Sequence, residues 1–176
     1  WPVFHYISTY ARFESENWES YKAVNQKFAE AISPHLNPGD TLWIHDYQLL
    51  LLPELIRSKH PDISIAFFQH IPFPSYEIIR MLPWRKEILW GMVGADLIGF
   101  HTYDDMRHFL SSVGRLLGMR SESGYIQAEN RLINVDAFPM GIDYDKFSLE
   151  AKSEKTIEKV KKIKGLLGDQ KLLLTI

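Results

Sequence analysis

The sequence has 176 residues, of which 45% are hydrophobic and 24% are charged, and its formal net charge is −2. This composition is typical of a soluble globular protein, and the small net charge gives no electrostatic attraction for nucleic acid or an anionic membrane. The absence of cysteine excludes disulfides and thiolate chemistry, and it is compatible with a reducing cytoplasm. The apolar stretch TLWIHDYQLLLLPELI is interrupted by His45, Asp46 and Pro53, so we expect no membrane-spanning segment.

Short apolar runs bounded by turn residues recur along the chain and predict β-strands. The first run, TLWIH, follows a turn at NPGD, and the fourth is preceded by a small hairpin that starts near GYIQ. The predicted strands cover residues 41–45, 63–69, 95–100, the end of the hairpin segment 124–139, and 171–176.

The segments around these strands have the three- or four-residue spacing of amphipathic helices. The clearest example runs from Asn17 to His35, with apolar positions at Trp18, Tyr21, Val24, Phe28 and Ile32. Pro53 stands near the start of its helix, where a missing N–H costs little, and Thr102 is the expected N-cap of another. The predicted helices cover residues 17–35, 49–60, 75–82, 84–94, 103–118 and 153–168.

Strands that alternate with helices predict parallel βαβ units, with helices on both faces of the sheet. The near-continuous apolar strands agree with burial on both faces. The predicted fold class is therefore α/β, a doubly wound, Rossmann-like parallel sheet. In such sheets ligands lie beyond the carboxyl ends of the strands, which selects the segments HDYQ, HIPFPS, HTYDD and PMGID.

The second of these segments is unusual because a histidine is followed closely by two prolines. His70 can donate or accept a hydrogen bond near neutral pH, although a core histidine bonded to a neighbouring loop is an alternative interpretation. Pro72 and Pro74 restrict the loop backbone, so it loses little entropy when a ligand binds. Asp46 can accept hydrogen bonds from sugar hydroxyls, or it can simply cap the helix that begins near Leu49.

Other chemistry is poorly supported. His101 and His108 flank Asp104 and Asp105, but this spacing matches no common zinc motif, so we predict no metal site. The sequence contains no GxGxxG, GxxxxGK[ST] or GxSxG motif, which removes the usual support for dinucleotide oxidoreductases, P-loop ATPases and serine hydrolases. Trp1 cannot be interpreted from periodicity.

Six segments in order, WPVFHY, SYKAVNQKFAEAI, GDTLWIHDYQLLLLPELIR, FFQHIPFPSYEIIRMLPWR, ADLIGFHTYDDMRHFL and AFPMGIDYDKF, resemble the trehalose-6-phosphate synthase family. The resemblance covers nearly the whole chain, and HIPFPS, GFHTYD and FPMGID are its most specific motifs. It implies a retaining glycosyltransferase of the GT-B fold, in which two Rossmann-like domains face each other. The implied reaction moves glucose from UDP-glucose to glucose 6-phosphate without a metal or another cofactor.

The resemblance also implies site residues. Trp1 matches the tryptophan that packs at the acceptor sugar, and Asp46 matches the aspartate that contacts the acceptor. His70 matches the histidine beside the transferred glucose, with a catalytic role, and Ile71 matches the neighbour that shapes this pocket. We expect Trp1, Asp46 and His70 to line one concavity. Gln48 and Gln69 stand where the family often has His and Leu, a difference that could alter donor or acceptor preference.

The resemblance further implies that the chain is a fragment. Residues 1–145 match an N-terminal acceptor-binding domain without its first strands, and residues 146–176 match the linker helix and first strand of a C-terminal nucleotide-sugar-binding domain. The Arg and Lys that hold the diphosphate in the family have no counterpart here, so we expect the fragment alone to be inactive. An exposed sheet edge favours self-association, and a homo-oligomer is possible.

Two alternatives stay open at this point. A sister transferase could use another acceptor, such as glycerol 3-phosphate, on the same framework. A non-catalytic homologue could bind sugar phosphate as a sensor.

Overall fold

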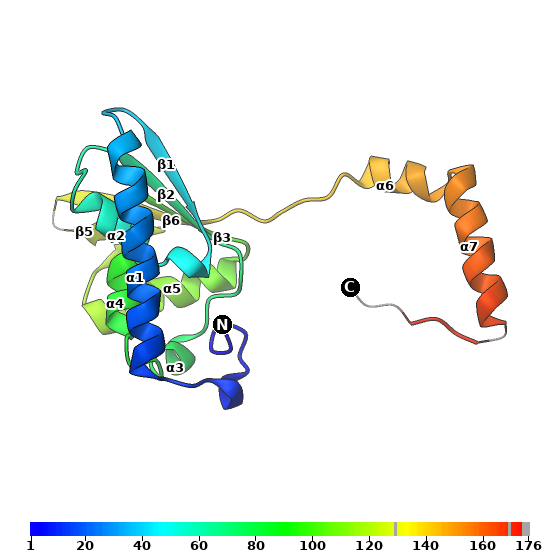
Figure 1. The fold of residues 1–176 in the computed structure, drawn as a ribbon, viewed down its shortest axis with the longest axis horizontal. Coiled ribbons are helices and arrows are strands. Elements are labelled where there is room, and N and C mark those ends of the chain that lie inside the picture. Colours follow the sequence, from blue (N-terminus) through cyan, green and yellow to red (C-terminus); the bar gives the residue numbers. More distant parts are fainter. Residues whose placement is uncertain (129, 169, 174–176) are drawn as a thin grey trace. The chain divides into compact units, whose positions relative to one another are not determined.

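The computed structural model describes residues 1–128, 130–168 and 170–173. The chain divides into two compact units, Trp1–Pro139 and Met140–Ile176. The second unit contains α6 (Tyr144–Ala151), which the sequence did not predict, and α7 (Glu154–Leu167), which follows α6 after a short connection (Figure 1). The assignment of residues 146–176 to a nucleotide-binding domain stays a prediction.

The strand predicted at residues 171–176 is not found in its described part, because residues 171–173 have no regular structure. The remaining three residues lie outside the described part of the chain. A single strand has no neighbouring strand with which to form its backbone hydrogen bonds. An apolar run therefore forms a β-strand only where a sheet is present for it to join.

The first unit is built on a six-stranded sheet with the strand order β1-β2-β3-β6-β5-β4. Four strands are parallel: β1 (Thr41–His45), β2 (Ser64–Gln69), β3 (Leu97–Phe100) and β6 (Arg131–Ala137). Two more, β4 (Ser121–Glu122) and β5 (Tyr125–Ala128), are antiparallel and complete the hairpin. The predicted α/β class with a mainly parallel sheet is confirmed.

Helices connect the strands as the sequence predicted. They are α1 (Ser15–Ile32), α2 (Leu52–Arg57), α3 (Tyr76–Ile79), α4 (Arg85–Met92) and α5 (Tyr103–Leu117), with 3-10 turns η1 (Ser8–Tyr10), η2 (Ser33–His35) and η3 (Tyr47–Leu49). Pro53 lies in the first turn of α2, and the Thr102 hydroxyl accepts a hydrogen bond from the Asp105 N–H as the N-cap of α5. Among the described residues, no helix combines the length and apolar character needed to cross a bilayer.

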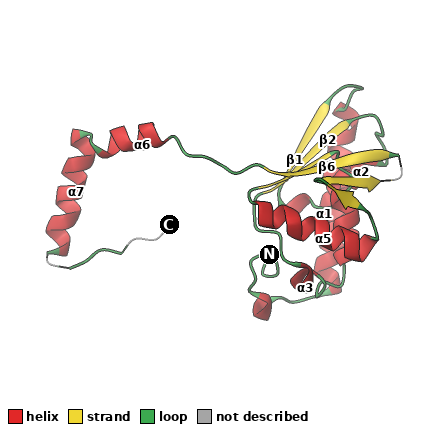
Figure 2. Cartoon of the chain, turned by 180° about the vertical axis from the view of Figure 1, so that it is seen from behind, coloured by secondary structure: helices red, strands yellow, loops and turns green. Residues whose placement is uncertain are grey.

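These helices lie against one face of the sheet, and in Figure 2 the strands lie above α3 and α5. Residues that point to this face are buried, as at Ile44, Phe67 and Ile98, whereas Trp43 on the other face is 63% exposed. The expectation of helices on both faces is therefore wrong for the described residues. Strand order runs in one direction from β1 to β6, and right-handed crossovers then place every connecting helix on the same face.

The described sheet ends at β1, so this strand offers unpaired backbone groups along one side. Trp43 adds an exposed indole to the same strand. Both features agree with the expectation of self-association, and homo-oligomerisation stays a prediction.

The buried face of α1 differs from the predicted stripe. Trp18, Asn25 and Ala29 are buried, whereas Val24 and Phe28 are 46% and 47% exposed. Asn25 lies inside because its side chain bonds the backbone of the chain that follows β1. The spacing of apolar residues therefore predicted the wrong part of the helix surface as buried. This pattern counts only apolar residues, so it does not detect a buried polar side chain such as Asn25.

Gln69 is fully buried on the helix-covered face, where it pairs with Phe100 of β3. Among the described residues, neither its Nε2 nor its Oε1 has a hydrogen-bond partner. A buried amide without partners loses its hydration and gains nothing in exchange.

We therefore expect Gln69→Leu to raise the free energy of unfolding by about 1–2 kcal/mol, since leucine has a similar size and no polar group. Urea unfolding of the chain measures this change. Gln48→Leu is the matched control, because Gln48 is exposed and its replacement should change stability by less than about 0.5 kcal/mol. A destabilised Gln69→Leu variant would show that the amide has a partner in solution.

Candidate active site at the strand ends

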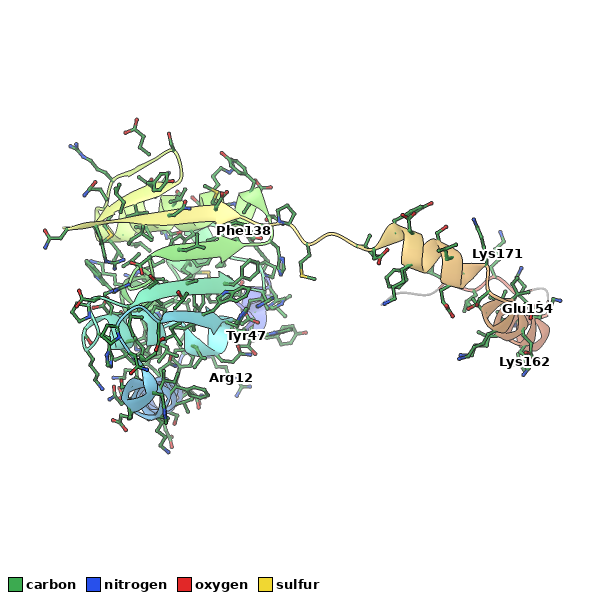
Figure 3. The ribbon with its side chains drawn as sticks, turned by 90° about the horizontal axis from the view of Figure 1, so that it is seen from above. Arg12, Tyr47, Phe138, Glu154, Lys162 and Lys171 are labelled. Carbon is green, nitrogen blue, oxygen red and sulfur yellow. The ribbon has the colours of Figure 1, made fainter. Side chains whose placement is uncertain are left out.

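The carboxyl ends of the parallel strands meet at one edge of the sheet. Register aligns them, because His45 pairs with Phe68 and Phe100 pairs with both Gln69 and Ala137. Figure 3 shows the strand arrowheads pointing to this edge, where Tyr47 and Phe138 are labelled. The predicted gathering of HDYQ, HIPFPS and HTYDD at one edge is confirmed. The segment PMGID spans the division between the two units, and its place at this edge stays a prediction.

Asp46 is held in a strained backbone conformation, with φ 70° and ψ 173°. This region of backbone space is almost restricted to glycine, and such strain is concentrated at functional sites. Its Oδ1 accepts hydrogen bonds from the N–H groups of Tyr47, at 2.9 Å, and His70, at 3.1 Å. Asp46 thus caps the 3-10 turn η3, and it also joins that turn to the loop after β2. It does not cap the helix that the sequence placed near Leu49, because α2 begins at Leu52 and has Leu51 as its N-cap.

His70 is exposed at this edge and is surrounded by other rings. Its Nε2 lies 2.9 Å from Nδ1 of His45, and the two imidazoles are stacked. The ring centroids of Phe68 and His101 lie 4.8 Å and 5.5 Å from that of His70. Three imidazoles from the ends of β1, β2 and β3 therefore form one polar cluster. The histidine is not the core residue of the alternative interpretation.

The loop after β2 is fixed by side chains from other elements. The Phe73 N–H donates to Oδ1 of Asp105 at 2.8 Å, and the Phe73 carbonyl lies 3.2 Å from Nδ1 of His108. The Ser75 N–H donates to the Tyr6 hydroxyl at 2.9 Å. Phe73 itself is fully buried, so the loop is anchored in the core. These contacts support the predicted preorganisation of HIPFPS.

Sequence reasoning missed the three side chains that hold this loop: Tyr6, Asp105 and His108. Asp105 stands three residues after the N-cap Thr102, so a capping interaction could have been expected from the sequence. The hydrogen bond from the Phe73 N–H to Oδ1 of Asp105 joins distant segments, as do the contacts of Tyr6 with Ser75 and of His108 with Phe73. No local sequence pattern encodes such contacts.

Trp1 lies at a neighbouring cavity. Its indole is 56% exposed and stacks on His5, with ring centroids 4.1 Å apart. The cavity has a volume of about 270 Å³, and its walls include Trp18 and Trp84, which stack at 5.0 Å. Tyr47 also lines it, and Arg12 contributes a positive charge at the rim (Figure 3).

The predicted site residues are therefore brought together in two groups. Asp46 and His70 are in direct contact, and Ile71 follows on the same loop, half-buried against the core. Trp1 lies apart from them, in the cavity that Tyr47 also lines, and Asp46, His70 and Ile71 are not among the residues that line that cavity. The prediction that all of them contact one ligand stays a prediction.

The fold and the site define an α/β protein whose candidate ligand crevice lies at the carboxyl edge of a parallel sheet. The sequence profile of glycosyltransferase family 20 matches residues 1–176, and the chain belongs to that family. It is 42% identical over 178 residues to the bifunctional trehalose-6-phosphate synthase/phosphatase of Thermoproteus tenax, covering 100% of this chain and 24% of that protein. It is 44% identical over 181 residues to the UDP-forming α,α-trehalose-phosphate synthase of Candida albicans, covering 100% and 38%.

Solved structures agree with this assignment. The N-terminal domain of Candida albicans trehalose-6-phosphate phosphatase superposes with a TM-score of 0.86 at 41% identity, covering 97% of this chain and 37% of that chain. An E. coli trehalose-6-phosphate structure with bound UDP-2-fluoro glucose gives a TM-score of 0.84 at 32% identity, covering 95% and 37%. The fold thus matches part of the GT-B trehalose-6-phosphate synthases. The chain spans about a quarter to two-fifths of the length of its relatives.

Proposed function

We propose that this chain is most of the acceptor-binding domain, and the start of the nucleotide-sugar-binding domain, of a longer trehalose-6-phosphate synthase, here termed the parent enzyme. The parent enzyme would transfer glucose from UDP-glucose to glucose 6-phosphate with retention of configuration. Family membership supports the reaction class. The observation that carries the assignment of the site is the contact between Asp46 and His70 across the ends of β1 and β2.

In this proposal the two carboxylate oxygens of Asp46 have different roles. Oδ1 is engaged by the backbone of Tyr47 and His70, which leaves Oδ2 to accept a hydrogen bond from an acceptor hydroxyl. The indole of Trp1 packs on the apolar face of the acceptor sugar, as aromatic rings do. His70 lies beside the transferred glucose, and Ile71 shapes that pocket.

Retention without an enzyme nucleophile is explained by attack on the same face of the sugar from which the phosphate leaves. The bond from the anomeric carbon to the UDP oxygen breaks, and the bond to the acceptor hydroxyl oxygen forms. The acceptor proton passes to the leaving phosphate. The protein then contributes positioning and stabilisation of charge, which a fixed loop and a strained, well-bonded Asp46 favour. No cofactor is part of this proposal, since UDP-glucose is a substrate.

The diphosphate of UDP needs cationic side chains, which we assign to the remainder of the second domain of the parent enzyme. The 176-residue chain alone is therefore expected to be inactive. A cytoplasmic location is part of the proposal as well.

The test compares acceptors in one assay. UDP release by the parent enzyme is measured with UDP-glucose and glucose 6-phosphate, glycerol 3-phosphate or glucose, and the isolated chain is assayed beside it. We expect turnover with glucose 6-phosphate alone, and none from the isolated chain. Preference for glycerol 3-phosphate would indicate a sister transferase, and saturable binding of glucose 6-phosphate without turnover would indicate a sensor.

A further inference from the structure

His45 is the last residue of β1, and its ring lies next to His70 at the candidate site. The rings are inclined by 27°, with centroids 5.1 Å apart, and Nδ1 of His45 is 2.9 Å from Nε2 of His70. This is an ordinary hydrogen-bond length between nitrogens. Trp43 also lies against the His45 ring, with ring centroids 4.6 Å apart and ring planes inclined by 42°. The imidazole of His45 therefore contacts both an indole and the ring of His70.

A hydrogen bond between two imidazoles restricts the protons on both. A neutral imidazole has one N–H and one lone pair, so one nitrogen of this contact must donate and the other must accept. If His45 donates, His70 carries its proton on Nδ1. If His70 donates, its Nδ1 has the lone pair. In both cases the tautomer of His70 is coupled to that of His45, so His45 influences what Nδ1 of His70 presents to a ligand.

The backbone of His70 is held separately. Its N–H donates to Oδ1 of Asp46, the residue that follows His45. Two consecutive residues at the end of β1 therefore fix the two parts of His70: Asp46 fixes the main chain and His45 fixes the ring. A group that must face a sugar in one orientation needs both constraints.

We propose that His45 is a positioning residue that orients the imidazole of His70 and couples the tautomer of that ring to its own. The kinetic consequence rests on the proposed function, because it requires His70 to lie beside the transferred sugar. The effect on the tautomer does not depend on that function and is measured without substrate.

The first measurement is made on the whole 176-residue chain labelled with ¹⁵N-histidine. Ring nitrogen shifts are recorded at about pH 9, where an unperturbed imidazole is neutral. We expect the ratio of the two His70 tautomers to change in His45→Leu, because the coupling to His45 is lost. His45→Asn should keep the ratio closer to that of the unchanged chain, because its amide places a hydrogen-bonding atom near the position of Nδ1. The control is His35→Leu, at an exposed position outside the site.

The same ratio of His70 tautomers in the unchanged chain and in His45→Leu would overturn the inference. The second measurement uses the parent enzyme. Loss of one hydrogen bond should lower kcat by about 2- to 10-fold in His45→Leu, with KM for glucose 6-phosphate nearly unchanged and partial recovery in His45→Asn. If the tautomer changes while kcat does not, positioning by His45 stands and the role of His70 in the proposed function is refuted.

Discussion

Replacing Asp46 by glycine is expected to lower kcat/KM of the parent enzyme for glucose 6-phosphate by about 10- to 100-fold, because a hydrogen bond to a charged group contributes roughly 1.5–3 kcal/mol. Most of the loss should appear as a higher KM for the acceptor. Glycine is the informative replacement, since Asp46 has a positive φ of 70° that alanine would occupy only with further strain. Initial rates at varied acceptor concentration, with UDP-glucose saturating, measure the effect.

The control for this prediction is Asp46→Asn. Asparagine retains an Oδ1 that can accept from the N–H groups of Tyr47 and His70, and it tolerates positive φ, so the loops should stay in place. It lacks the charge of the second oxygen, so its kcat/KM should lie between those of the unchanged enzyme and Asp46→Gly. Unaltered acceptor kinetics in both variants would refute the assignment of Asp46 as an acceptor ligand.

Replacing Asn25 by alanine is expected to lower the free energy of unfolding by about 3 kcal/mol. Asn25 is fully buried; its Nδ2 donates to the carbonyls of Tyr21 and Gln48 at 3.0 Å, and its Oδ1 accepts from the Leu51 N–H at 3.2 Å. Alanine would remove the partner of the Gln48 carbonyl and of the Leu51 N–H, both of which are in part-buried hydrogen bonds. Urea unfolding of the chain, followed by tryptophan fluorescence, gives the change.

Gln26→Ala provides the matched control on the same helix. The Gln26 side chain makes one exposed hydrogen bond, to Glu30, so its loss should cost less than about 0.5 kcal/mol. Equal effects of the two replacements would contradict the structural role of Asn25. The same region contains Tyr21, whose hydroxyl donates to the Tyr47 carbonyl and accepts from the Leu50 N–H. Burial raises the pKa of this phenol far above its ordinary value, so it remains a neutral donor.

Asn25 and Tyr21 connect stability to the candidate site. They bind four backbone groups in the turn that follows Asp46. Side chains of α1 thus hold the turn that follows Asp46, and the His70 N–H in the loop after β2 bonds Asp46 itself. Together these contacts hold Asp46 in its strained conformation. A strained residue persists only where its surroundings determine it in this way.

Periodicity in the sequence was sufficient to find the strands and helices of the first unit and to place Asp46, His70 and His101 at one edge of the sheet. These features depend on local physics, since strand and helix spacing, N-caps and the direction of parallel strands are all encoded within short segments. The motifs HIPFPS, GFHTYD and FPMGID added the family, which the comparisons confirm.

Only the tertiary structure decided which side of the sheet the helices cover, that Asn25 rather than Val24 or Phe28 lies inside, and that Gln69 faces the core. It alone paired His45 with His70 and attached the loop after β2 to Tyr6 and Asp105. The reason is that each of these features depends on hydrogen bonds or packing between residues more than twenty positions apart in the chain. Such partners are determined by how the strands are ordered in space, which no local pattern records.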